Sequence, residues 1–330
     1  MLYKHLFRVS SLCMTDKPRN ILMVAPSFPY PESGAEQADR AAGIRQLVRL
    51  GHRVTVIAKV VEWADHEQLA EVARSWGVRL VLVPYRYSNR TLSYFERLKK
   101  TLGRLRNPLY LDGAAYEYAE PGIQAALARE LAEFKPDLAW FEYTYLWPLY
   151  PMVHRAGLPI VTRSVNFEPA HFLEEDGRSP LNLLKYLAKY YGERRTIRAS
   201  THVLAITPKE REVYKRWGAD ALVLPLRSMP PFLLLPCAFR STAAPLRVCF
   251  MGSSFSVEHN RAAAREIITK TVPAALKRAP GAFVFHIFGG KLPEDLRAQC
   301  NSTDLVYEGY VQDLDARLAA MDIALVPSLY

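Results

Sequence analysis

Short apolar runs that alternate with helix-forming segments constrain the fold of this chain more than any other feature of its sequence. The first run, at 21–25, ends in a proline-rich turn, and apolar residues then recur at helical spacing from Glu36 to Leu50. A second run follows at 53–58. Continuous apolar runs of this length are typical of buried parallel strands, so the strand–helix–strand order indicates the first unit of a doubly wound sheet.

The alternation reaches the end of the chain with one interruption, a proline-containing, irregular stretch at 227–245. Before it, the pattern predicts further strands at 79–84, 137–141, 159–162, 202–206 and 221–225. After it, the pattern predicts strands at 246–252, 282–288, 305–307 and 322–326, with helices at 258–278, 294–300 and 313–321.

These elements predict an α/β fold of two Rossmann-like domains, each with a doubly wound parallel sheet, that face a cleft. The N-terminal domain is placed at 20–226, the linker at 227–245 and the second domain at 246–330. Residues 1–19 are expected to be a disordered or spurious extension. Because no helix follows the last strand to cover its apolar face, we expect the second domain to be incomplete.

Composition excludes several classes of protein. With 50% hydrophobic and 23% charged residues the chain is globular rather than disordered or fibrous. Its four cysteines form no C-x-x-C pair, which argues against a zinc site or a disulfide framework and fits a reducing cytosol. No apolar run approaches the about 20 residues that cross a bilayer. The net charge of +10 indicates an acidic partner: nucleic acid, an anionic membrane or a phosphorylated substrate.

The second half carries the segments VCFMGSSFSVEHNRAA, FVFHIFGG and LVYEGYVQDLDARLAAMDIALVPSLY, and the first half carries FPYPESGAE and GHRVTVI. In this order, the glycine turns, the Gly-Tyr-Val and the Val-Pro-Ser resemble the retaining GT-B glycosyltransferases of glycosyltransferase family four. The resemblance runs from about Ile21 to Tyr330. It implies an enzyme that moves a sugar from a nucleotide-sugar donor, with the donor held by the second domain.

Glycine-rich strand ends of the second domain are the candidate donor site. A strand-to-helix turn offers amide groups and hydroxyls to phosphate, and an ordinary turn is the alternative. By resemblance, the Gly-Tyr-Val turn reads the base. The family's Arg after the first glycine is Ser253 here and its Lys is missing, so Lys291, after the paired glycines, is expected to meet the diphosphate charge. The predicted donor-binding residues are Gly252, Ser253, Ser254, Gly289, Gly290, Lys291, Gly309, Tyr310, Val311 and Ser328.

Polar residues of the first domain form the candidate acceptor side. Gly34 precedes a helix whose positive end suits an anion or an acceptor, although a plain turn glycine would look the same. Arg163 and Asn166 follow a strand and are expected to face the cleft. By resemblance, Glu168 and His171 are the catalytic candidates, with His171 in place of the family's histidine, whose position is Val165 here. The alternative is that these groups cap and brace the loop.

The resemblance also implies the chemistry. Retaining enzymes of this kind are thought to work by front-face displacement, in which positioned donors stabilise the leaving diphosphate, so we expect neither a metal ion nor another cofactor. The family's two donor-binding glutamates, about seven residues apart, are expected after Tyr330. The chain as it stands is therefore predicted to be inactive.

A basic amphipathic stretch occupies 91–109. Its apolar residues fall on one helical face and its basic residues surround them, a profile typical of a helix that lies on an anionic membrane. A helix packed on its own sheet with a solvated basic face is the alternative. The residues are Leu92, Phe95, Leu98, Leu102 and Leu105, with Arg97, Lys99, Lys100, Arg104 and Arg106; a second basic cluster is Arg194, Arg195 and Arg198.

The leading hypothesis is sugar transfer with retention to a glycan or lipid-linked acceptor in cell-envelope or exopolysaccharide synthesis. The enzyme would then be cytoplasmic, and the basic stretch would make it peripheral on the inner face of the plasma membrane. A nucleotide-sugar 2-epimerase shares the fold, but its acid and base residues cannot be assembled here. A basic nucleic-acid-binding protein is the non-enzymatic alternative, and no recognised nucleic-acid module supports it. No G-x-G-x-x-G follows the first strand, which disfavours a dehydrogenase.

Overall fold

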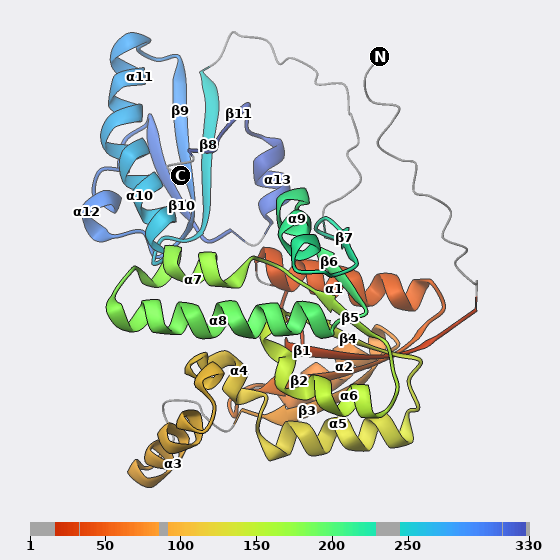
Figure 1. The fold of residues 1–330 in the computed structure, drawn as a ribbon. Helices are drawn as coiled ribbons and strands as arrows, with labels where there is room; N and C mark the ends of the chain where they lie inside the picture. Colours follow the sequence, from red (N-terminus) through yellow and green to blue (C-terminus); the bar gives the residue numbers. More distant parts are fainter. Residues whose placement is uncertain (1–16, 33, 86–91, 229–244, 312, 328–330) are drawn as a thin grey trace. The chain divides into compact units, whose positions relative to one another are not determined.

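The structure is a computed structural model that describes residues 17–32, 34–85, 92–228, 245–311 and 313–327 (Figure 1). The chain divides into two compact units, residues 1–232 and 233–330. The division falls within the stretch predicted as the linker. Of the predicted N-terminal extension, all but the last three residues lie outside the described part.

The first unit is built on a seven-stranded, all-parallel sheet with the strand order β3-β2-β1-β4-β5-β6-β7. The order reverses between β1 and β4, which makes this the switch point at which doubly wound sheets bind ligands. Every strand predicted for this region is confirmed. The strands are β1 (Asn20–Ser27), β2 (Arg53–Val60), β3 (Arg79–Pro84), β4 (Leu138–Glu142), β5 (Ile160–Arg163), β6 (His202–Ala205) and β7 (Ala221–Val223).

Alternating residues of β1 build the two faces of this core. Ile21 and Met23 pack in the cluster that Ile44 of α1 (Ala35–Arg49) and Leu69 of α2 (His66–Ser75) complete. Leu22 and Val24 point to the opposite face, where α5 (Pro121–Glu133) and α6 (Tyr150–Arg155) cover them. Successive side chains of a strand leave on opposite faces, so a central strand buried on both faces must be apolar throughout.

Several elements of the first unit lie outside this layered core. Helix α3 (Tyr94–Leu105) begins with a capping box made by Ser93 and Glu96, has no buried residue, and extends away from the body of the unit (Figure 1). The 3₁₀ segment η1 (Pro108–Leu111) and α4 (Gly113–Glu117) follow it. The remaining segments are η2 (Thr144–Leu149), α7 (Glu168–Asp176), α8 (Pro180–Ala199) and α9 (Pro208–Arg216).

The second unit contains a four-stranded parallel sheet with the order β10-β9-β8-β11. Its switch point lies between β8 and β11. The predicted strands are again confirmed, and the helix predicted at 258–278 is present as α10, a π-helical turn η3 and α11. The elements are β8 (Leu246–Ser254), α10 (Glu258–Glu266), η3 (Ile267–Thr271), α11 (Val272–Arg278), β9 (Phe283–Gly290), α12 (Glu294–Arg297), β10 (Leu305–Gly309), α13 (Leu314–Ala319) and β11 (Ile323–Leu325).

Candidate functional site

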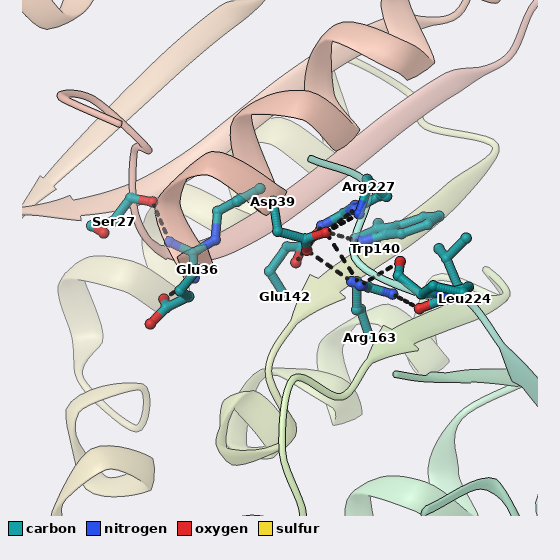
Figure 2. Close-up of polar contacts among 10 residues, drawn as sticks. Ser27, Glu36, Asp39, Trp140, Glu142, Arg163, Leu224 and Arg227 are labelled. Atoms are coloured by element: carbon teal, nitrogen blue, oxygen red, sulfur yellow. Dashed lines mark hydrogen bonds and ion pairs between the residues drawn. The ribbon is translucent and has the colours of Figure 1, made fainter. Parts of the chain in front are cut away.

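Charged side chains gather at the carboxyl edge of the first unit's sheet, where strands of this topology bind ligands. Arg227 donates to Asp39 at 2.8 Å and to Glu142 at 3.0 Å, and Arg163 donates to Asp39 at 3.2 Å (Figure 2). Trp140 adds a hydrogen bond to Glu142 at 2.9 Å. No side chain of the four ionic residues is more than 4% exposed. Two carboxylates thus balance two guanidiniums away from water.

The ionisation of this cluster follows from its geometry. Burial raises the pKa of Asp39, but hydrogen bonds and charge from Arg227, with a further contribution from Arg163, outweigh it and leave the pKa below its usual range. Asp39 therefore stays ionised at neutral pH. A buried pair of this kind is costly to break because the remaining partner keeps an uncompensated charge.

Arg163 corrects one prediction. It was expected to face a ligand, but its side chain is fully buried and also donates to the carbonyl oxygens of Leu224 and Pro225 at 2.8 and 3.2 Å. Arg227 corrects another, since it was expected to begin the linker and is instead held in the first unit by Asp39 and Glu142. No sequence pattern could indicate this, because the partners come from separate strands and helices.

A second group of residues lies at the switch point, and it joins the predicted Gly34 to Arg40 and Tyr143, which no motif indicated. Gly34 caps α1 without a side-chain hydrogen bond and has a φ of 92°, a conformation that favours glycine. Arg40 is 1% exposed, pairs with Glu36 and donates to the carbonyl oxygen of Ser27 at 3.3 Å. Its guanidinium lies 5.8 Å from the ring centre of Tyr143, the residue after β4.

Ser164 braces the loop after β5. Ser164 donates to the backbone oxygen of Asn166 at 2.9 Å and contacts the hydroxyl of Tyr214 at 2.6 Å. Tyr214 donates in turn to Glu193 of α8 at 2.7 Å, and burial raises the pKa of Glu193 well above its usual range. Asn166, Glu168 and His171 are all half-buried, with Glu168 as the first residue of α7. Their ligand-binding and catalytic roles stay predictions.

Glycines bring the strand ends of the second unit close together. Gly289 has a φ of 137°, and a Cβ atom on it would lie 2.0 Å from the carbonyl oxygen of Gly252. The carbonyl oxygen of Gly289 accepts a hydrogen bond from Tyr307 at 2.8 Å. These two glycines are therefore required for packing between β8 and β9, whatever they bind. A Cβ atom added to Gly290 would meet no atom within 4 Å.

The other predicted donor residues lie at the same edge. Lys291 follows β9 and is exposed, while Gly309 ends β10 with a φ of 72° and precedes Tyr310, which is 74% exposed. The hydroxyl of Ser254 lies 2.7 Å from that of Ser256. Val311 is half-buried, only the backbone of Ser253 is described, and Ser328 lies outside the described residues. The structure thus brings most of the predicted donor set to three adjacent strand ends.

Glu308 stands next to this set. It accepts a hydrogen bond from His286 at 2.7 Å and another from Arg317. Burial opposes its ionisation, but these two partners outweigh burial and lower its pKa. An ionised carboxylate is thereby fixed one residue before the predicted base-reading turn.

Comparison with known proteins identifies the family. The sequence profile described as glycosyl transferase 4-like domain matches residues 40–226. The chain belongs to this family. As a glycosyltransferase it shares its fold with Arabidopsis thaliana UGT89C1 complexed with UDP-L-rhamnose, at 11% identity and a TM-score of 0.53 over 94% of this chain and 74% of that one. No curated protein matches it in sequence.

Two further solved structures support the GT-B fold of this glycosyltransferase. One is a glycosyltransferase from Rickettsia africae, at 13% identity and a TM-score of 0.52 over 95% of this chain and 74% of that one. The other is the glycotransferase of kitacinnamycin, at 14% identity and a TM-score of 0.51 over 93% and 75% of the two chains. Among the described residues of the glycosyltransferase, no helix is long and apolar enough to cross a membrane.

Proposed function

We propose that this glycosyltransferase transfers a sugar, with retention and without a metal ion, from a nucleotide-sugar to a hydroxyl of a glycan or lipid-linked acceptor. The donor binds at the carboxyl edge of the second unit's sheet, and the acceptor binds at the carboxyl edge of the first. The pathway we propose is the synthesis of a cell-envelope or extracellular polysaccharide.

The observation that carries the donor site is the set of glycine strand ends at β8, β9 and β10. Glycine lets backbone amides approach a phosphate closely, and the start of a helix such as α10 adds its positive end. We assign the exposed Lys291, which follows the end of β9, to neutralise the diphosphate, and the exposed Tyr310, which follows β10, to contact the base. These features suit a nucleoside diphosphate better than a neutral sugar.

Retention would follow from positioning rather than from a committed nucleophile. The leaving diphosphate accepts the proton of the acceptor hydroxyl while amide groups and Lys291 stabilise its growing charge. Glu168 and His171, at the start of α7, are proposed to contact the reacting groups from the first unit.

Thermal stabilisation tests the donor proposal directly. A panel of nucleotide-sugars should raise the melting temperature, with UDP-sugars tested first because the Arabidopsis neighbour was solved with UDP-L-rhamnose. A ligand at 100 times its dissociation constant stabilises by about 2.7 kcal/mol. Lys291→Met should reduce the shift, whereas Lys277→Met, at the end of α11, should not. If no nucleotide-sugar shifts melting while a nucleic acid does, the proposal is wrong.

Helix α3 supports a second partner, an anionic membrane surface. Its apolar residues are exposed, with Phe95 at 79%, Leu102 at 56% and Leu105 at 69%. This contradicts the alternative in which α3 packs its apolar face on its own sheet. A groove of about 560 Å³ between α3 and the segment Tyr110–Pro121 adds further apolar surface. We propose that α3 holds the enzyme at the inner face of the plasma membrane, next to lipid-linked acceptors.

Liposome flotation tests the membrane surface. The chain should float with vesicles that contain about 30% phosphatidylserine and not with neutral ones, because each basic residue near an anionic surface contributes about 1 kcal/mol. The double variant Phe95→Ser/Leu102→Ser should lose flotation. Leu222→Ser, which changes an exposed leucine on β7, is the matched control. Recovery that does not depend on anionic lipid would contradict the proposal.

A further inference from the structure

A single tyrosine of β10 closes the turn that follows β9. The hydroxyl of Tyr307 donates to the carbonyl oxygen of Gly289 at 2.8 Å and accepts a longer hydrogen bond from the backbone N–H of Leu292 at 3.4 Å. Gly290 and Lys291 are the two residues between these points. One side chain therefore bonds both ends of the turn that carries the lysine assigned to the diphosphate.

The backbone of this turn has to be held in place. Lys291 has a φ of 62°, in the left-handed region that favours glycine, and such a conformation persists only where neighbouring groups fix it. On the β8 side, the backbone N–H of Phe255 donates to the carbonyl oxygen of Gly290 at 2.9 Å. On the β10 side, Tyr307 makes both contacts. The turn is thus held from the sides of the two strands that flank β9.

The same arrangement leaves the side chain of Lys291 available to a ligand. It is exposed, and within the described part of the chain no carboxylate forms an ion pair with it. Because β9 lies between β8 and β10, its turn is the middle one of the three glycine strand ends. An ammonium group on a fixed turn at this point meets a diphosphate without a prior rearrangement of the backbone, which would otherwise reduce affinity.

The ring and the hydroxyl of Tyr307 make separate contacts. The ring packs against the core of the second unit, and the guanidinium of Arg297 lies 5.9 Å from its centre. A phenylalanine ring would make these contacts equally well. The hydroxyl adds only the two bonds to the turn, so its contribution can be measured apart from packing.

We propose that Tyr307 is a positioning residue of the donor site, whose hydroxyl holds the turn from Gly289 to Leu292 so that Lys291 meets the diphosphate of the nucleotide-sugar. This inference rests on the proposed function, since it names the residue that arranges the diphosphate contact of that same site. Tyr307 acts through Lys291 rather than on the ligand, and it lies outside the predicted donor set.

Isothermal titration calorimetry on the 330-residue chain tests the inference without turnover. The probes are UDP, GDP, ADP, CDP and dTDP, and the one that binds most tightly to the wild type is titrated into each variant. Tyr307→Phe keeps the ring and removes both hydrogen bonds, so it should weaken binding about fivefold. Lys291→Met should weaken it about tenfold. The double variant should bind no more weakly than Lys291→Met alone, because the effect of Tyr307 passes through Lys291.

Hydrogen exchange separates this role from a general loss of stability. Without ligand, the Leu292 amide should exchange faster in Tyr307→Phe, while the amides at 284–287 in β9 keep their wild-type rates. Tyr150→Phe is the matched control, because it removes a buried tyrosine hydroxyl that contacts Thr162 at 2.6 Å in the first unit. It should bind the nucleotide as the wild type does.

Several results would overturn the inference: unchanged binding in Tyr307→Phe or in Lys291→Met, additive losses in the double variant, an equal loss in Tyr150→Phe, or an unchanged Leu292 amide. Nucleotide binding by the wild type would in each of these cases leave the proposed donor site standing. If the wild type binds none of these nucleotides, the proposed donor site is wrong and the inference is wrong with it.

Discussion

Both sheets are parallel, but different kinds of residue lie at their carboxyl edges. At its carboxyl edge the first sheet carries a buried, charge-balanced set of side chains that includes Asp39, Glu142 and Arg227. The second sheet ends in glycines, among them Gly252 and Gly289, which bring the backbones of β8 and β9 close together. Under the proposed function, the acceptor would bind at the first edge and the donor diphosphate at the amides of the second.

Removing Arg227 from the charge-balanced set at the first sheet's carboxyl edge should have the largest effect on stability. Arg227→Met leaves Asp39 and Glu142 buried with too little positive charge, so the free energy of unfolding of the first unit should fall by about 3–5 kcal/mol. All five tryptophans lie in residues 1–232, so tryptophan fluorescence during urea unfolding reports this unit alone. Arg211→Met, which removes an exposed pair with Glu212, should cost less than about 1 kcal/mol. Equal losses of stability in Arg227→Met and Arg211→Met would contradict the special role of the buried charges.

Adding a side chain at Gly289, at the carboxyl edge of the second sheet, should have the next largest effect on stability. Gly289→Ala places a methyl group against the carbonyl oxygen of Gly252 and forces an unfavourable φ, so the second unit should lose about 3 kcal/mol. Hydrogen exchange of the β8 and β9 amides measures the change. Gly290→Ala meets open space and should change little. Similar exchange in both variants would mean that the strand ends are not closely packed.

The stabilities of the two units should also depend on pH in opposite directions. The folded-state pKa of Glu193 is raised, so its contribution to stability is complete below the ordinary glutamate pKa of about 4.3 and is lost as pH rises toward the folded value. The loss reaches at most about 1.4 kcal/mol per pH unit. Glu193→Gln should flatten the fall in tryptophan-monitored stability between about pH 5 and 7. An unchanged slope would contradict a neutral Glu193.

The smallest predicted effect has the opposite sign and belongs to the second unit. The pKa of Glu308 is lowered by His286 and Arg317 against the effect of burial, so its contribution is present above the ordinary glutamate pKa and is lost as pH falls through the folded value. Glu308→Gln should therefore reduce the acid sensitivity of β10 hydrogen exchange by about 0.5 kcal/mol. Glu294→Gln, at an exposed position, should leave it unchanged.

The strands could be predicted because a buried parallel strand must be an apolar run, and Ile21–Ala25 needs no distant partner to show it. Gly252 and Gly289 could be found because glycine marks a strand end in the sequence itself. Arg163 was misplaced because a buried guanidinium and an exposed one look alike in a sequence. Arg40 and Tyr143 carried no signal, since their contact joins a helix to a strand end that meet only in the folded unit.

The central claim is that the glycine edge of the second unit binds the donor diphosphate. Hydrogen–deuterium exchange of the full chain, with and without a UDP-sugar, tests it most directly. Amides at 252–254, 289–291 and 309–311 should exchange more slowly with the ligand. Amide exchange around the buried charged side chains of the first unit should stay unchanged. Protection confined to the first unit, or no protection at these three strand ends with any nucleotide-sugar that stabilises the chain, would contradict the account.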